Sequence, residues 1–328
     1  MNCMKSLLLL LSFIFFISNV EVLSNEQKNL SSSTINKELK IALILWRGET
    51  KAEVSFKKTL KDLGYKVKYT IYNAQNQRFK FPDVLRAIDF SKYDYIYTFG
   101  TTASQLSKRL LDNKVPQIFN IVSSPVMANV VESMSNNGGN IAGVSNQVPL
   151  ELQIKTALSV FKFKRLALFF NPREQNSMII RSKLIHLGQK YNFEVVSLRS
   201  PIKDMLTENL NKLTSGTVSV DAVYLPADSF IVSNARLIGE ELRKAKIKSI
   251  GAIQEYVEQG ALMGTVTDYT KLGEMAASIV HQHKNGTNLE NIPVQIQENP
   301  FIVLNKITCD VLEIELDQSI LDQAIIIK

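Results

Sequence analysis

The feature of this sequence that most constrains its fold is a series of strand and helix patterns that occurs twice, in the same order. In each half, short apolar runs typical of buried strands alternate with segments of helical spacing. Four strand centres in the first half correspond to four in the second, at separations of 125, 128, 127 and 132 residues: Ala42 and Ala167, Val67 and Val195, Tyr95 and Ala222, and Ile118 and Ile250. A single sheet does not readily give such a repeat, so we expect two similar lobes.

Alternating strands and helices with apolar strands predict the α/β class, with two doubly wound parallel-sheet lobes. The expected strands are 41–46, 66–71, 93–99 and 117–122 in the first half, and 166–170, 194–198, 221–225 and 248–253 in the second. In such sheets ligands bind beyond the carboxyl ends of the strands. The residues that follow each strand are therefore the candidate site.

The N-terminus has the pattern of a secretory signal peptide. Lys5 precedes an apolar run of about a dozen residues, shorter than the roughly 20 that a membrane-spanning helix needs. We expect residues 1–24 to be a signal peptide cut after Ser24 and residues 25–39 to be a flexible polar leader. A buried helix is the alternative. If the segment is a signal peptide, as we expect, the chain is exported and is periplasmic or otherwise extracytoplasmic.

Cysteine content and charge bear on two further questions, disulfide bonding and nucleic-acid binding. Cys3 lies before the apolar run, so removal of the signal leaves Cys309 alone and allows no intramolecular disulfide. The formal net charge is +7, but the lysines and arginines are scattered along the chain. Solvated helix faces explain this charge better than a nucleic-acid surface does, and we expect no nucleic-acid partner.

In the first half, the sequence Gly-Thr-Thr-Ala-Ser links a strand directly to a helix. The hydroxyls of Thr101 and Thr102, with the N–H groups of the helix N-terminus, favour an anion such as a carboxylate. Ordinary helix capping by either threonine is the alternative. Trp46, at the end of the first strand, is either core or a cover for an apolar ligand group. Asn120 and Ser123 follow the fourth strand and are further candidates.

In the second half, the equivalent strand end contains Asn171, Asn176 and Ser177, which are ligand candidates or simply turn and cap residues. Asp228 ends a later strand. It can hold a ligand ammonium group or cap the next helix, and we favour the ligand role because no basic residue is near it in the sequence.

The three histidines, His186, His281 and His283, do not form a metal-binding pair, and no nucleotide, hydrolase or zinc-protease motif occurs. We therefore expect no catalytic residues, no metal, no cofactor and no enzymatic activity.

Several segments together resemble a known family. They are Phe-Gly-Thr-Thr-Ala at 99–103, Asn-Gly-Gly-Asn-Ile-Ala-Gly-Val-Ser at 137–145, Asn-Pro at 171–172 with Asn-Ser at 176–177, Leu-Pro-Ala-Asp-Ser at 225–229, Asp-Tyr-Thr-Lys-Leu-Gly at 268–273, and an ending from Ile-Pro-Val at 292–294 to Val-Leu-Asn at 303–305. In order and spacing the chain resembles the ABC-transporter substrate-binding proteins of the tryptophan/tyrosine-binding type, which have a type I periplasmic-binding-protein fold.

The resemblance implies an extracytoplasmic receptor that delivers a small ligand to an ABC permease and its ATPase. It implies that Thr101 and Thr102 hold the ligand carboxylate, while Asn176, Ser177 and Asp228 contribute from the other lobe. It also implies hinge crossings near residues 137–145, 265–268 and 291–294. We accordingly expect one lobe from residues 40–143 and about 269–291, and the other from 144–268 and about 292–328, in a monomer.

One departure from the family leaves the ligand open. The family commonly has Asp-Pro where this chain has Ser124-Pro125, so recognition of an α-amino group is in doubt. The sequence predicts a small carboxylate-bearing ligand, such as an aromatic or other apolar amino acid. A ligand-sensing module for a membrane receptor and a hydrolase using Asp228 are the alternative functions.

Overall fold

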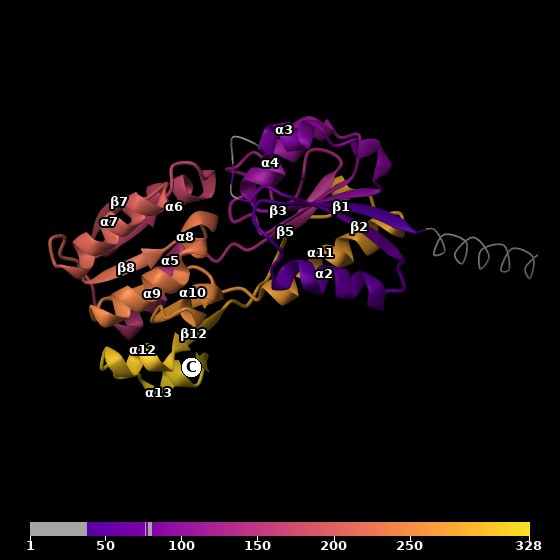
Figure 1. Cartoon of the computed structure of the whole chain (residues 1–328). Helices are drawn as coiled ribbons and strands as arrows, with labels where there is room; N and C mark the ends of the chain where they lie inside the picture. The colour runs from indigo at the N-terminus through magenta and orange to yellow at the C-terminus, as the bar shows by residue number, and fades with distance from the viewer. Residues whose placement is uncertain (1–37, 76, 78–80) are drawn as a thin grey trace, which may run out of the picture.

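A computed structural model describes residues 38–75, 77 and 81–328. Figure 1 shows two lobes, each with a central sheet and covering helices, lying side by side. The expected signal peptide, most of the leader and Cys3 lie outside the described residues. Within that described part, no helix has both the length and the apolar character that crossing a membrane requires.

The first lobe has a six-stranded sheet in the order β11-β5-β4-β3-β1-β2, and every neighbouring pair in it is parallel. Two of its helices have side-chain caps: Asp268 caps α11, and Thr50 and Glu53 form a capping box at the start of α2, in which each side chain bonds the other's backbone. The strands are β1 Leu39–Leu45, β2 Val67–Asn73, β3 Tyr95–Phe99, β4 Gln117–Asn120, β5 Ile141–Ser145 and β11 Gln295–Ile296, and the helices are α2 Lys51–Asp62, α3 Phe81–Arg86, α4 Thr101–Leu111 and α11 Tyr269–Lys284, with 3-10 turns at Phe90–Lys92 and Leu289–Asn291.

The second lobe has a seven-stranded sheet in the order β13-β12-β10-β9-β8-β6-β7. Its pairs are parallel except β10 with β12, which is antiparallel, so this sheet is mixed rather than wholly parallel as expected. The strands are β6 Arg165–Phe170, β7 Glu194–Arg199, β8 Ala222–Leu225, β9 Lys248–Gly251, β10 Met263–Val266, β12 Phe301–Asn305 and β13 Ala324–Ile327, and the helices are α5 Leu150–Val160, α6 Gln175–Tyr191, α7 Lys203–Thr214, α8 Ser229–Ser233, α9 Ala235–Lys244, α10 Gln254–Glu258, α12 Lys306–Val311 and α13 Gln318–Leu321.

The two lobes repeat one topology, as the sequence pattern predicted. In each, the first strand pairs in parallel with the second on one side and the third on the other: β1 lies between β2 and β3, and β6 lies between β7 and β8. Separate apolar cores fill the two lobes, one around β1 and β3 and the other around β6 and β8. The predicted fold class, two α/β lobes with mostly parallel sheets, is confirmed.

The chain passes between the lobes three times. The glycine-rich segment expected to form the first crossing instead leads into β5, with Gly138 and Gly139 in the turn before it at φ values of 72° and 143°. These angles favour glycine, which explains that composition without a hinge. The crossings follow β5, β10 and β11. Each of these strands belongs to the sheet of one lobe, and the next element along the chain belongs to the other lobe. The lobe limits given above stay a prediction, although β11 belongs to the first sheet beyond the expected crossing near residue 292.

Candidate ligand-binding site

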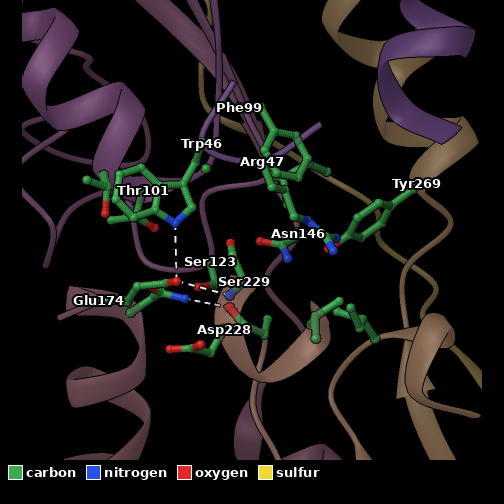
Figure 2. Close-up of a pocket in the computed structure, with 17 residues that line it drawn as sticks. Trp46, Arg47, Phe99, Thr101, Ser123, Asn146, Glu174, Asp228, Ser229 and Tyr269 are labelled. Carbon is green, nitrogen blue, oxygen red and sulfur yellow. Dashed lines mark hydrogen bonds between the residues drawn. The ribbon is translucent and has the colours of Figure 1, made fainter. Parts of the chain in front are cut away.

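A pocket lies between the lobes, beyond the carboxyl ends of strands from both sheets (Figure 2). It contains about 410 Å³ of space between its lining atoms, part of which is open to solvent. This is the position that doubly wound sheets offer to ligands. The lining residues are Trp46, Arg47, Phe99, Gly100, Thr101, Thr102, Ile121, Ser123, Asn146, Glu174, Asn176, Ala227, Asp228, Ser229, Val232, Ile253 and Tyr269.

The wall from the first lobe is formed by the start of α4 and the segment after β4. Gly100 caps the helix with φ of 86°, a conformation that favours glycine, and Thr101 and Thr102 are buried in its first turn. The first N–H groups of a helix have no partners within it and carry partial positive charge. Ile121 after β4 has φ of 58°, a strained angle for a β-branched residue, held where Asn120 Oδ1 accepts from its N–H. This wall offers hydrogen-bond donors.

The wall from the second lobe presents a buried carboxylate, Glu174, just before α6. Its Oε1 accepts from the Trp46 indole N–H at 3.2 Å, and its Oε2 accepts from the backbone N–H of Ser229 at 3.1 Å (Figure 2). The first bond joins the two lobes, because Trp46 follows β1. Desolvation raises the pKa of Glu174, and the hydrogen bonds from Ser229 and Trp46 oppose that shift.

Asp228, fully buried, is the second carboxylate of this wall. Its Oδ1 accepts from the backbone N–H of Ile231 at 2.9 Å, so the residue caps α8, the alternative that the sequence left open. Its Oδ2 has no partner within normal hydrogen-bond geometry. Desolvation raises the pKa of Asp228 well above its usual range, the neighbouring Glu174 charge adds to that rise, and the nearby Ser177 hydroxyl lowers the pKa of the carboxyl. Two such acids favour a cation in contact with them, because a cation stabilises their ionised forms.

A third group of residues closes the pocket on the side of α10 and α11. The Arg47 guanidinium lies 5.6 Å from the ring centre of Phe99, and its Nη1 is 3.3 Å from Oε2 of Glu255 in the other lobe. Burial raises the pKa of Tyr269 to about 12, and the Asn146 amide beside its hydroxyl opposes that rise. Asn146 lies in the crossing after β5, so this side of the pocket is built partly from the connections between the lobes.

Six of the nine predicted ligand residues line the pocket: Trp46, Thr101, Thr102, Ser123, Asn176 and Asp228. Asn176 is among them, but its Nδ2 donates to the Ala227 carbonyl, so its amide is partly engaged with the protein. The structure brings together residues more than 170 positions apart, as the predicted meeting of strand ends requires.

The other three predicted residues do not line this pocket. Asn120 is buried behind it and donates to the Tyr97 hydroxyl and the Leu272 carbonyl. Asn171 Oδ1 accepts from the Arg173 N–H, and the Asn171 N–H donates to Ser177 Oγ. These side chains brace the strand ends and loops that carry the lining residues, and direct ligand contact by them stays a prediction.

Sequence reasoning missed five polar or charged lining residues: Arg47, Asn146, Glu174, Ser229 and Tyr269. Arg47 directly follows Trp46 at the end of the first strand. Glu174 lies in the loop from Asn171 to Ser177, whose residues could also be explained from the sequence as turn formers. Asn146 and Tyr269 lie in the crossings. A search that gave the crossings the same weight as the strand ends would have found them.

Direct contacts across the cleft hold the lobes close together. Gln105 on α4 donates to Gln175 Oε1 on α6 at 2.7 Å, and Lys51 Nζ is 2.9 Å from Glu258 Oε1. With the Trp46–Glu174 and Arg47–Glu255 contacts, these interactions lie on several sides of the pocket. The described geometry is therefore that of a closed cleft.

The residues that the structure describes contain no group of three or more potential metal ligands. His281 and His283 on α11 each contact a different tyrosine, Tyr65 and Tyr95, as expected for side chains on different sides of a helix.

Comparison with known proteins gives the family. Residues 42–328 match the ABC transporter substrate binding protein family, so the chain belongs to that family of solute-binding proteins, which work with ABC permeases. A curated relative, the tyrosine-binding protein of Clostridioides difficile, is 28% identical over 298 residues, which cover 89% of this chain and 85% of that protein.

Two solved structures support the same fold. The ABC domain from Streptococcus pneumonia in complex with L-Trp has a TM-score of 0.81 and 22% identity, and the match covers 88% of this chain and 99% of that one. A ligand-free, open substrate-binding protein from Clostridium difficile has a TM-score of 0.67 and 22% identity, with 88% and 99% covered. The chain is thus a substrate-binding component of an ABC transporter with a type I periplasmic-binding-protein-like fold.

Proposed function

We propose that this protein binds an L-amino acid with an aromatic or other apolar side chain and delivers it to an ABC permease. The observation that carries the proposal is the division of the pocket between two kinds of wall. The N-terminus of α4, with Thr101 and Thr102, suits a carboxylate, and the buried pair Glu174 and Asp228 suits an ammonium group. An amino acid carries both charges on one carbon.

The unpartnered Asp228 Oδ2 supports this orientation. A buried oxygen without a hydrogen bond is unfavourable by about 1–3 kcal/mol, and an ammonium group donates up to three hydrogen bonds. Asp228 and Glu174 therefore compensate for the absence of the family's usual aspartate at Ser124. The name of the curated relative, a tyrosine-binding protein, and the L-Trp in the pneumococcal complex agree with an aromatic amino acid.

The remaining parts of the proposal concern where the protein acts. Residues 1–24 direct export and are removed, residues 25–39 form a leader ahead of the two lobes, and the chain works outside the cytoplasm as a monomer. It delivers its ligand to the permease without changing it chemically. Determining the N-terminal residue of the exported protein and recovering the ligand intact after incubation test these statements.

Isothermal titration calorimetry on the purified protein tests the binding proposal. The titrants are L-tyrosine, L-tryptophan and L-phenylalanine, together with tyramine, which lacks the carboxylate, and 3-(4-hydroxyphenyl)propionate, which lacks the ammonium group. We expect at least one amino acid to bind and both truncated compounds to bind at least about tenfold more weakly than L-tyrosine. Equal binding of L-tyrosine and either truncated compound would contradict the assignment of that wall.

A further inference from the structure

A second compartment adjoins the pocket and lies mainly within the second lobe. It contains about 450 Å³ of space between its lining atoms, part of which is open to solvent, and shares Ser123, Asn146 and Ala227 with the first pocket. The other lining residues are Ser124, Gln147, Val148, Leu150, Gln153, Ile180, Lys183, Tyr224 and Ala252. The shared residues place the second compartment next to the first pocket, beside a ligand whose polar end lies there.

Part of the lining is apolar or has its hydrogen bonds already made. Val148, Leu150 and Ile180 supply apolar surface. The polar pair Tyr224 and Gln153 is already satisfied, because the tyrosine hydroxyl donates to Gln153 Oε1 at 2.9 Å and Gln153 Nε2 donates to a carbonyl at 3.1 Å. These groups suit the apolar body of a ligand side chain.

Lys183 differs from the rest of the lining. It is the one charged residue of the compartment, it is half-buried on α6, and within the part of the chain described here it has no hydrogen bond or ion pair. The second lysine of this helix, Lys190, contacts Glu151 at 2.9 Å. A lysine ammonium only donates hydrogen bonds, so it favours an oxygen acceptor at the far end of the ligand.

Asn146 marks the junction between the two compartments. Its side chain is buried, and its Oδ1 has no partner. Figure 2 shows this oxygen on the side of Ser123, within the cleft, and the amide nitrogen on the side of Tyr269. An acceptor in this position suits an N–H donor of the ligand where the side chain leaves the first pocket.

We propose that the second compartment receives the ligand side chain and that Lys183 selects one ending in an oxygen, with a phenol as the best match. The apolar walls contact the ring, Lys183 Nζ donates to the phenol oxygen, and Asn146 Oδ1 accepts from the ligand ammonium group. The inference rests on the proposed function and adds to it a selectivity for L-tyrosine over L-phenylalanine.

Calorimetry of L-tyrosine and L-phenylalanine with four proteins tests this inference: wild type, Lys183→Met, Lys183→Gln and Lys190→Met. We expect wild type to bind L-tyrosine at least about tenfold more tightly than L-phenylalanine, from one charge-assisted hydrogen bond. Lys183→Met should weaken L-tyrosine binding by a similar factor, leave L-phenylalanine unchanged and bring their ratio near one. Lys183→Gln, with a neutral donor, should give an intermediate ratio, and Lys190→Met should change neither affinity.

The outcomes separate the two proposals. If wild type binds no aromatic or other apolar amino acid, the proposed function itself fails; if it binds another of these but neither L-tyrosine nor L-phenylalanine, only the selectivity is wrong. If wild type binds both with equal affinity, or Lys183→Met weakens both by the same factor, the selectivity is wrong while the binding function stands. The unfolding midpoint of each variant without ligand confirms that it is folded. If Lys183→Met does not fold, the comparison of wild type with Lys183→Gln decides the question.

Discussion

The two walls of the cleft come from lobes with the same strand order, yet they differ in charge. The first lobe contributes hydroxyls, the N-terminus of α4 and the Trp46 indole, all of which can donate hydrogen bonds. The second lobe contributes the buried carboxylates Glu174 and Asp228. The repeat has therefore kept the position of the site and divided its chemistry, so that a ligand with two opposite charges touches both lobes only when they are close.

The largest effect should come from removing a charge from the acidic wall. Asp228→Asn retains an oxygen that can cap α8 but loses the charge that faces the ligand ammonium group. We expect amino-acid affinity to fall by about a hundredfold, because breaking one partner of a buried charge pair is strongly unfavourable. Calorimetry measures this, with Asp317→Asn, an exposed residue at the start of α13, as the control. Unchanged affinity would place the ammonium group elsewhere.

The same variant should gain stability without ligand, and the gain should depend on pH. Because burial raises the folded-state pKa of Asp228, the folded protein binds a proton more tightly than the unfolded chain. The resulting stability is fully present below the unfolded pKa of about 3.9 and is lost as pH rises toward the folded pKa. We expect Asp228→Asn to match the stability of wild type near pH 4. At pH 7 its free energy of unfolding should exceed that of wild type by at least about 1 kcal/mol, which raises its unfolding temperature. Calorimetric unfolding at both pH values checks this; a variant less stable at pH 7 would contradict it.

A smaller effect is expected from the donor wall. Thr102→Val removes one hydroxyl from the first turn of α4 and leaves the backbone N–H groups in place. Affinity for the amino acid should fall by about three- to tenfold, the usual contribution of a single hydrogen bond. Thr287→Val, in an exposed turn of the same lobe, is the matched control. A loss as large as that of Asp228→Asn would mean that the two walls contribute equally.

The smallest effect should come from the exposed ion pair between the lobes. Lys51 and Glu258 are 2.9 Å apart, with the lysine side chain 62% exposed. Lys51→Met should weaken ligand binding by no more than a few-fold at low salt and not measurably at high salt, because solvent and ions screen such pairs. Titrations at two ionic strengths test this. A large loss that salt does not reduce would show that the pair does more than hold the lobes together.

The fold was largely predictable because it depends on apolar periodicity, which the sequence displays directly. The four strand pairs of the repeat are present, and strand β4 ends early only because Ile121 adopts a left-handed conformation that no pattern reveals. The antiparallel β12 was missed for a related reason. Its five residues read as a strand in either direction, and its direction is set by the chain crossing that precedes it.

The site was predictable only in part, because a strand end identifies a segment and not the direction of each side chain. Thr101 and Asp228 lie in the pocket. Asn120 and Asn171 also lie at strand ends, but their side chains hydrogen-bond to backbone groups of the protein and do not line the pocket. Lys183 could not be found by this route at all. It lies in the middle of α6, and only the packing of that helix against β6, β7 and α5 brings it to a cavity.

Trp46 offers a practical consequence of the cleft geometry. It is the single tryptophan of the chain, it is 3% exposed, and its indole N–H reaches across to Glu174. Separation of the lobes would break that bond and bring water to the ring, which shifts indole fluorescence to longer wavelength. The protein thus contains its own optical reporter, and opening rates can be followed by stopped flow without attaching a dye.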